Sequence, residues 1–280
     1  MDFKKFSELI MIEQTLFALP FSLLGVLFAG GGTVGTWFWV IIAMAAARTA
    51  GMSFNRVIDA GIDAKNPRTR DRLIPKGEVR PEVVWMAAVI SSLLLIGASF
   101  MLNRLCFYLS FPAVFMLFTY SYFKRFSASS HFYLGLVEAA APIGGYIAVT
   151  GEFTRVPFVL GLVIFTWIAG LDIVYAIQDV EFDIKENLHS IPVRMGKKKA
   201  LFISTACYMV SISAMVYAGL LTHKNVFYWA AVVSVGMIFL YQQRLARSQN
   251  MALSINFFFK ANMYISPILF IGTFTDVFIL

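Results

Sequence analysis

Charged side chains are scarce in this sequence of 280 residues: Asp, Glu, Lys and Arg together make up 14%, while 59% of the residues are hydrophobic. So few charges cannot cover the surface of a soluble protein of this size, and a disordered chain would contain far fewer apolar residues. Long apolar runs recur along the chain instead, as in helical membrane proteins. The composition therefore predicts an all-α, polytopic membrane protein, and we expect residues 1–280 to form one domain.

Cysteine and histidine are also rare. Cys106 and Cys207 lie in separate apolar runs, so neither a disulfide framework nor a thiolate metal site is expected. His131, His189 and His223 are scattered near loop ends, so a histidine metal site is not expected either. The net charge of +7 comes from basic residues beside apolar segments, where they set orientation and contact anionic headgroups. Nucleic-acid binding is therefore not expected.

Nine apolar segments have the length of a membrane span. A hydrocarbon core about 30 Å thick needs about 20 apolar residues per helix. The predicted spans are 9–30, 36–54, 83–102, 105–123, 132–149, 156–177, 200–221, 226–243 and 261–280. The prolines inside them are expected to kink helices rather than end them, because neighbouring groups satisfy the freed carbonyls. We therefore expect nine transmembrane helices.

Basic residues alternate from one connection to the next. Nineteen of the 23 Lys and Arg residues lie before the first span or in every second connection, whereas the other connections hold only Arg104, Arg155 and Lys224. Cytoplasmic loops are the ones that carry excess Lys and Arg. This asymmetry predicts a cytoplasmic N-terminus and an external C-terminus. We expect the protein to lie in a bacterial cytoplasmic (inner) membrane. The first span lacks a convincing cleavage site and is expected to be retained.

Two long connections predicted to be cytoplasmic, 56–82 and 178–199, hold 21 of the 39 charged residues. Residues four apart share one helical face. Two polar series have helical spacing of four or seven residues: Asn55, Asp59 and Asp63 continue the second span, while Asp172, Asp179 and Asp183 continue the sixth. Asp59, Asp63 and Lys65 recur 120 residues later as Asp179, Asp183 and Lys185. This weak internal repeat is typical of membrane proteins built from two related halves. We expect the two series to face one cavity.

Carboxylate and amide oxygens are ligands that Mg²⁺ accepts, and protein-bound Mg²⁺ usually also binds substrate phosphates. Basic residues close to the two series would stabilise the charge on a departing diphosphate. These are Arg68, Arg70, Arg72, Lys124 and Arg125. A hydrophobic bundle accommodates a long lipid tail, so the predicted substrate is a polyprenyl diphosphate.

Arg48, Asp172 and Glu138 are ionisable residues inside predicted spans, where a charge is costly and is by default functional. Arg48 precedes Asn55 by two helical turns on nearly the same face, and Asp172 lies more than a turn inside its span. Glu138 meets the same criterion, but a structural bond to a neighbouring helix explains it equally well. Arg48 therefore either binds an anionic substrate group or pairs with Asp172 or Glu138.

Four motifs carry a resemblance that covers nearly the whole chain. They are Asn55-Arg56-x2-Asp59-x3-Asp63, Arg68-Thr69-x2-Arg72-x-Ile74-Pro75-x-Gly77, Tyr120-x3-Lys124-Arg125-Phe126, and the stretch from Asp172 through Gln178-Asp179 and Asp183 to Lys185. Together they resemble the UbiA-type intramembrane prenyltransferases, which attach isoprenoid chains to aromatic quinone precursors. Leu73 stands where relatives often carry proline, but Pro75 remains, so we expect little effect. Arg70 and Asp71 replace the commoner Ala-Asn and make this cap more charged.

The resemblance implies a nine-helix bundle with a cytoplasmic-side cavity and helical cap loops, in the segments 55–82 and 172–199. It implies three sets of site residues: Mg²⁺ bound through Asn55, Asp59, Asp63, Asp179 and Asp183; diphosphate contacts from Arg72 and Lys124; and an aromatic acceptor near Arg48 and Asp172. The four aspartates Asp59, Asp63, Asp179 and Asp183 are the residues expected to be essential for catalysis.

The aromatic acceptor is left open by these motifs, because they concern the diphosphate. 4-Hydroxybenzoate, on the way to ubiquinone, is the commonest acceptor in the family. The stretches 178–183 and 189–192 look at least as much like enzymes that prenylate 1,4-dihydroxy-6-naphthoate on the way to menaquinone. A secondary transporter is the rival function, since intramembrane charges and two related halves also occur there. A non-catalytic lipid-binding protein would give no reason for two aligned carboxylate series.

Overall fold

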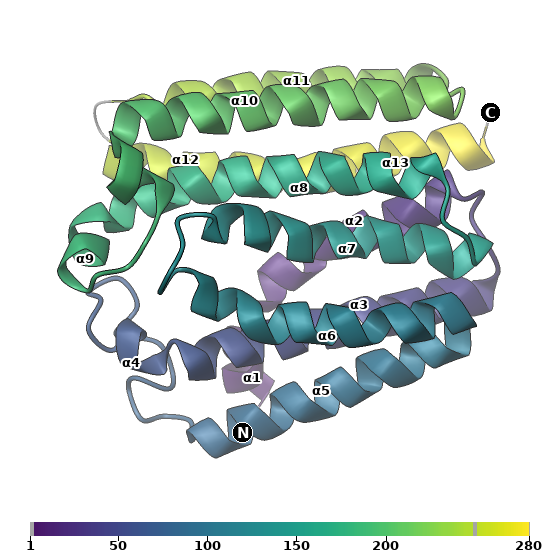
Figure 1. Ribbon diagram of the computed structural model, residues 1–280. Coiled ribbons are helices and arrows are strands. Elements are labelled where there is room, and N and C mark those ends of the chain that lie inside the picture. The colour runs from purple at the N-terminus through teal and green to yellow at the C-terminus, as the bar shows by residue number, and fades with distance from the viewer. Residues whose placement is uncertain (1–2, 249–250, 280) are drawn as a thin grey trace.

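The computed structural model describes residues 3–248 and 251–279, and within these ranges all regular structure is helical. The long helices run side by side along a common direction (Figure 1). In chain order, the elements are α1 (Phe3–Ile10), α2 (Ile12–Phe28), α3 (Val34–Ile58), α4 (Ala60–Asp63), α5 (Pro81–Leu102), α6 (Arg104–Phe123), α7 (Ser130–Thr150), α8 (Arg155–Ala176), the 3-10 helix η1 (Ile177–Asp179), α9 (Val180–Lys185), α10 (Ile191–Leu221), α11 (Val226–Ala246), α12 (Met251–Asn262) and α13 (Ile265–Phe278).

Eight helices in the described part of the chain are long and apolar enough to cross a membrane. This confirms the predicted multi-span, all-α membrane fold. The first predicted span corresponds to α2, which has 17 residues and an apolar stretch over Leu19–Phe28. The count of nine crossings therefore stays a prediction.

Two predicted spans have wrong boundaries. The segment 9–30 is not one helix, because Met11 adopts a left-handed conformation (φ 51°) that ends α1 before α2 begins. The last span was predicted at 261–280, but a helix begins at Met251 and is interrupted between Asn262 and Ile265. The segment 244–260 was predicted to be a basic loop, yet Ile255 and Phe258 are buried in the main hydrophobic core. Because these two side chains are buried, the second part of the segment 244–260 is helical, although its basic residues suggested a loop.

The helices α2 and α7 approach each other through glycine. A Cβ atom at Gly145 would lie 1.9 Å from the backbone oxygen of Ser22, and one at Gly25 would lie 2.1 Å from that of Pro142. Small residues let transmembrane helices pack backbone to backbone, which is favourable where lipid removes the hydrophobic driving force between helices. The glycines therefore hold α7 against α2.

Each predicted motif segment continues a long helix into a short one. Asp59 links α3 to α4, and Asp179 ends η1, which links α8 to α9. In Figure 1, α4 and α9 lie at the same end of the bundle, and the C-terminus lies at the opposite end. The chain returns from α9 into α10, which begins at Ile191 rather than at 200 and is kinked at Gly196, where φ is 77°. A positive φ is accessible to glycine without a steric penalty. The fold thus brings both carboxylate series to one end.

Candidate functional site

Asp59 lies at the centre of the first polar cluster and is only 1% exposed. Its Oδ2 accepts hydrogen bonds from Asn55 Nδ2 (2.8 Å) and Lys124 Nζ (2.7 Å), and its Oδ1 accepts one from Arg125 Nη2 (3.4 Å). A buried carboxylate is tolerated when cations and donors satisfy it in this way. The structure therefore brings Asn55, Asp59 and Lys124 together, as the sequence led us to expect.

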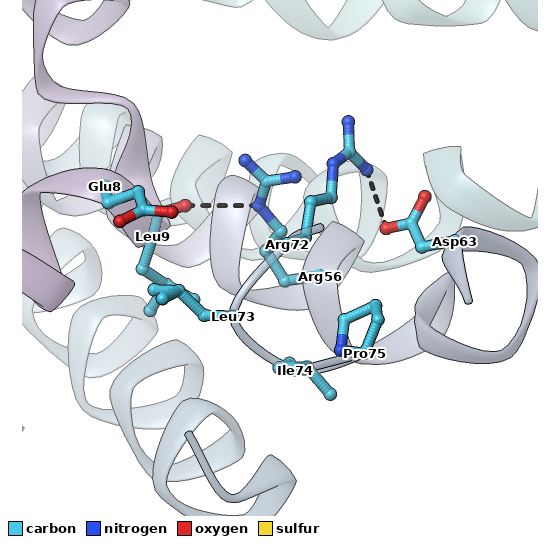
Figure 2. Close-up of a pocket in the computed structure, with 8 residues that line it drawn as sticks. All are labelled: Glu8, Leu9, Arg56, Asp63, Arg72, Leu73, Ile74 and Pro75. Carbon is cyan, nitrogen blue, oxygen red and sulfur yellow. Dashed lines mark hydrogen bonds and ion pairs between the residues drawn. The ribbon is translucent and has the colours of Figure 1, made fainter. Parts of the chain in front are cut away.

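Asp63 lies one turn further along the chain, at the end of α4, and is 4% exposed. Arg72 donates from Nη1 to Asp63 Oδ2 at 2.6 Å (Figure 2). Thr69 donates from its hydroxyl to the backbone oxygen of Asp63 at 3.2 Å, which folds the intervening loop back onto α4. The folded loop therefore holds the guanidinium of Arg72 against the carboxylate of Asp63.

Asp179 joins the second motif to the first. Arg68 donates to its two carboxylate oxygens at 3.0 and 2.6 Å, and Asn66 Nδ2 donates to Oδ1 at 3.4 Å. Arg68 also donates to the hydroxyl of Tyr175. Burial by itself lowers the pKa of Arg68, but the hydrogen bonds to Asp179 and the proximity of Tyr175 raise it overall. These contacts hold the second motif segment against the loop that follows the first, whereas a cavity shared by the two carboxylate series stays a prediction.

A second ion pair joins the same two segments: Lys65 Nζ lies 2.6 Å from Glu186 Oε2. Asp183 follows Asp179 by one turn on α9, and its backbone oxygen accepts from the Leu188 amide at 2.8 Å, closing the loop after α9. The repeated pattern of the sequence therefore becomes two half-sites, each with a carboxylate at a helix end and a second one four residues later.

The donor atoms suit Mg²⁺, because the carboxylate and amide oxygens at the site are hard ligands. Among the described residues, no three side chains of His, Cys, Asp or Glu are close enough together to hold a metal ion by themselves. Mg²⁺ usually takes only one or two protein carboxylates and completes its shell with water and substrate phosphates. Two separate carboxylate pairs therefore fit a metal that arrives with a diphosphate.

Arg48 and Glu138 form an ion pair deeper in the bundle, between α3 and α7. Arg48 Nη1 lies 3.1 Å from Glu138 Oε1, and the two side chains are 16% and 18% exposed. Of the alternatives open from the sequence, the structure therefore contains the pairing of Arg48 with Glu138. The pair compensates the guanidinium charge inside the bundle, so Arg48 is not dependent on a substrate anion for its burial.

Asp172 has a partner that sequence reasoning missed. His131, which is 3% exposed at the start of α7, lies with Nδ1 2.7 Å from Asp172 Oδ2. The Ile191 amide donates to His131 Nε2 at 3.2 Å, so Nε2 acts as the acceptor and Nδ1 as the donor to the carboxylate. The sequence predicts only that His131, near a loop end, does not bind a metal. Its position at the boundary of a span was the available signal, since a buried polar ring there needs partners.

Comparisons with known proteins agree with this geometry. The UbiA prenyltransferase family matches residues 18–266. The 4-hydroxybenzoate octaprenyltransferase of Vibrio atlanticus is 29% identical over 239 residues, covering 84% of this chain and 82% of that protein. The protein of the same name from Pectobacterium carotovorum subsp. carotovorum is 26% identical over 271 residues, covering 96% and 91%.

Solved structures share the fold. The apo structure of a UbiA homologue from Aeropyrum pernix K1 superimposes with a TM-score of 0.88 at 26% identity, covering 95% of this chain and 98% of that one. A UbiA homologue from Archaeoglobus fulgidus, bound to GPP and Mg²⁺, has a TM-score of 0.72 at 18% identity, covering 98% and 99%. The second likeness concerns the fold alone.

Proposed function

Because the chain belongs to the UbiA prenyltransferase family, we propose that it transfers a polyprenyl group from a polyprenyl diphosphate to a hydroxylated aromatic acid. The observation that carries the proposal is the contact between the two half-sites, in which Arg68 binds Asp179 at 2.6 Å across the end of an apolar bundle. The gathering of carboxylates from both halves and of several cations at one end of the bundle supports a diphosphate site there. The hydrophobic bundle beneath accommodates the isoprenoid chain.

Mg²⁺ would be held by Asn55, Asp59 and Asp63 on one side and by Asp179 and Asp183 on the other. When bound, it supplies charge neutralisation for a diphosphate that leaves with the electrons of the carbon–oxygen bond. Its presence in the Archaeoglobus protein, which has the same fold, is in keeping with this assignment. The oxygen-only donor set of the two half-sites is the support from this chain itself.

Lys124 and Arg72 would bind the diphosphate oxygens. Each already contacts a carboxylate of the first half-site: Lys124 lies 2.7 Å from Asp59, and Arg72 lies 2.6 Å from Asp63. A cation placed there stabilises the charge that develops on the leaving group. The electron-rich ring carbon of the acceptor then attacks the allylic carbon, and the ring loses a proton as the carbon–carbon bond forms.

The acceptor proposal is 4-hydroxybenzoate, on the basis of the relatives named 4-hydroxybenzoate octaprenyltransferase. Arg48 would hold its carboxylate, because the planar fork of a guanidinium matches a carboxylate in a bidentate way. Asp172 would lie on the other side of the ring. The acceptor 1,4-dihydroxy-6-naphthoate carries the same carboxylate and is the second substrate to be tested.

The test is product formation by purified protein in lipid with Mg²⁺, a polyprenyl diphosphate and each aromatic acid, followed by mass measurement. Asp63→Ala and Asp179→Ala should abolish the product. Asp71→Ala is the matched control, because this carboxylate lies in the same loop with a side chain 74% exposed. Absence of product with every aromatic acid, or uptake of a solute by the same preparation, would favour the rival transporter function.

A further inference from the structure

Three of the four aspartates in the two half-sites are already paired with a cation. The pairs are Lys124 with Asp59 at 2.7 Å, Arg72 with Asp63 at 2.6 Å and Arg68 with Asp179 at 2.6 Å. Asp183, the fourth, has no ion-pair partner in the part of the chain that the structure describes. The carboxylates proposed to bind Mg²⁺ are therefore largely neutralised by side chains of the protein itself.

The pair between Arg68 and Asp179 engages both carboxylate oxygens of the second half-site. Arg68 Nε donates to Oδ1 at 3.0 Å, and Nη2 donates to Oδ2 at 2.6 Å. The two side chains are 33% and 15% exposed, and salt screens a partly buried pair less than a surface pair. A metal ion at the same oxygens would lie beside the guanidinium, and repulsion between the two positive charges opposes their binding together.

Aromatic residues hold the guanidinium of Arg68 beside Asp179. Its Cζ lies 4.6 Å from the centroid of the Tyr175 ring, and the Tyr175 hydroxyl accepts a hydrogen bond from Nη1. Phe259, from the helix α12, packs edge-on against Tyr175, with ring centroids 5.0 Å apart. A cation over an aromatic face is attracted by the ring. The guanidinium therefore has a defined binding position, formed by α8 and α12, which an ordinary surface cation lacks.

We propose that Arg68 competes with Mg²⁺ for Asp179, so that the second half-site stays closed to the metal until a diphosphate is also present. Without a diphosphate, metal binding would leave a partly buried guanidinium without an anion, which is unfavourable. With a diphosphate, the guanidinium gains phosphate oxygens as it loses Asp179, and the number of ion pairs is conserved. Metal and diphosphate should therefore each raise the affinity for the other, because coupling between two ligands is reciprocal. This inference rests on the proposed function, since it concerns the regulation of that same site.

The test measures the affinity for Mg²⁺ alone, without any diphosphate, on the purified full-length protein after treatment with EDTA and removal of the chelator. The melting temperature is followed across a titration with MgCl₂ at constant ionic strength, since a ligand that binds the folded protein stabilises it. Arg68→Gln frees Asp179 and should bind Mg²⁺ about tenfold more tightly than the wild type, within the range of about 5–150-fold that is typical of coupled sites. Arg68→Lys keeps the charge without the forked contact and should give an intermediate affinity, which decides the matter if Arg68→Gln does not fold.

Lys65→Gln is the matched control. It removes the same charge from the same loop and breaks the neighbouring ion pair with Glu186, at 2.6 Å, whereas Asp179 keeps its contact with Arg68. Its Mg²⁺ affinity should stay within about twofold of the wild type, because exposed charges interact weakly and are screened by salt. The double variant Arg68→Gln with Asp179→Asn should lose the gain, since the freed carboxylate is then absent.

A Mg²⁺ affinity in Arg68→Gln equal to or below that of the wild type overturns the proposal. An equal gain in Lys65→Gln also overturns it, because that result would come from a general effect of charge or from a loosened loop. Prenylation assays separate the competition from the proposed function. Product from the wild type with unchanged Mg²⁺ affinity in Arg68→Gln removes only the competition, whereas tighter Mg²⁺ binding in Arg68→Gln without product from the wild type removes only the proposed reaction.

Discussion

His131 acts on its neighbours through two nitrogens with opposite roles. Nδ1 donates to Asp172 and Nε2 accepts from the Ile191 amide, so the ring joins α7, α8 and the start of α10. An Asn side chain places its amide near the position of Nδ1, and a Gln side chain places its amide near that of Nε2. The two substitutions therefore separate the bond to the carboxylate from the bond to the backbone.

We expect His131→Asn to retain a donor for Asp172 and to keep most of the activity toward the aromatic acid. His131→Gln should lower kcat/KM for the acid about tenfold or more, because Asp172 loses a charge-assisted hydrogen bond of about 1.5–3 kcal/mol. Steady-state kinetics with both substrates varied would measure this, with melting temperatures recorded for both variants. Equal losses of activity and stability in the two variants would leave His131 a packing residue.

Arg48 has a similar ambiguity, because its partner Glu138 already neutralises it. If Arg48 also binds the acceptor carboxylate, Arg48→Lys should raise KM for the aromatic acid several-fold more than KM for the diphosphate, since a point charge does not reproduce a bidentate contact. Glu138→Gln is the control that removes only the internal partner. An unchanged ratio of the two KM values in Arg48→Lys, with a lower melting temperature in both variants, would remove Arg48 from the acceptor site.

At the scale of elements, the crossing of α2 and α7 is sensitive to a single methyl group. Gly145→Ala should destabilise the protein by about 1–3 kcal/mol, because its Cβ would lie 1.9 Å from the backbone oxygen of Ser22, which cannot rotate away. Gly144→Ala is the matched control, since a Cβ there has no neighbouring atom within 4 Å and alanine favours helix. Thermal unfolding in detergent compares the two variants, and equal melting temperatures would contradict this view of the crossing.

Most spans were predictable, because crossing lipid requires about 20 apolar residues and few sequences satisfy this by accident. The break at Met11 was not, since a left-handed residue inside an apolar run leaves no mark in hydropathy. The helix α12 was missed for the opposite reason: basic residues marked 244–260 as a loop, while burial of Phe258 made it helical. Hydropathy indicates which segments are apolar enough to lie in lipid, whereas the residues at which helices begin and end depend on local packing.

The same distinction applies to the site. The spacing of Asp59 and Asp63, and of Asp179 and Asp183, predicted two oriented series, because helical periodicity is a property of the sequence. The partners were less predictable: Arg68 crosses to Asp179 over 111 residues, and His131 reaches Asp172 over 41. Such pairings depend on how helices far apart in the chain come together. The sequence shows which side chains are charged, but only the folded structure shows which of them pair with one another.

At the scale of the whole molecule, the connections rich in Lys and Arg are those that carry the motif segments. Arg194 and Lys197 to Lys199 are exposed at the start of α10, close to the end where α4 and α9 lie. Clustered cations at the end of a span contact anionic headgroups and resist translocation. The distribution of charge therefore predicts that the motif end of the bundle faces the cytoplasm.

Epitope tags test this orientation. Tags inserted after Ser7, within 66–71 and within 187–190 should be protected in sealed, right-side-out vesicles, whereas a tag after residue 280 should be accessible. The physical reason is the ratio of nineteen basic residues on one set of connections to three on the other. Permeabilised vesicles provide the control in which all four tags are accessible. A protected C-terminal tag would mean an even number of crossings. The 17-residue α2 would then be the first helix to re-examine, because its length lies at the lower limit for a membrane span.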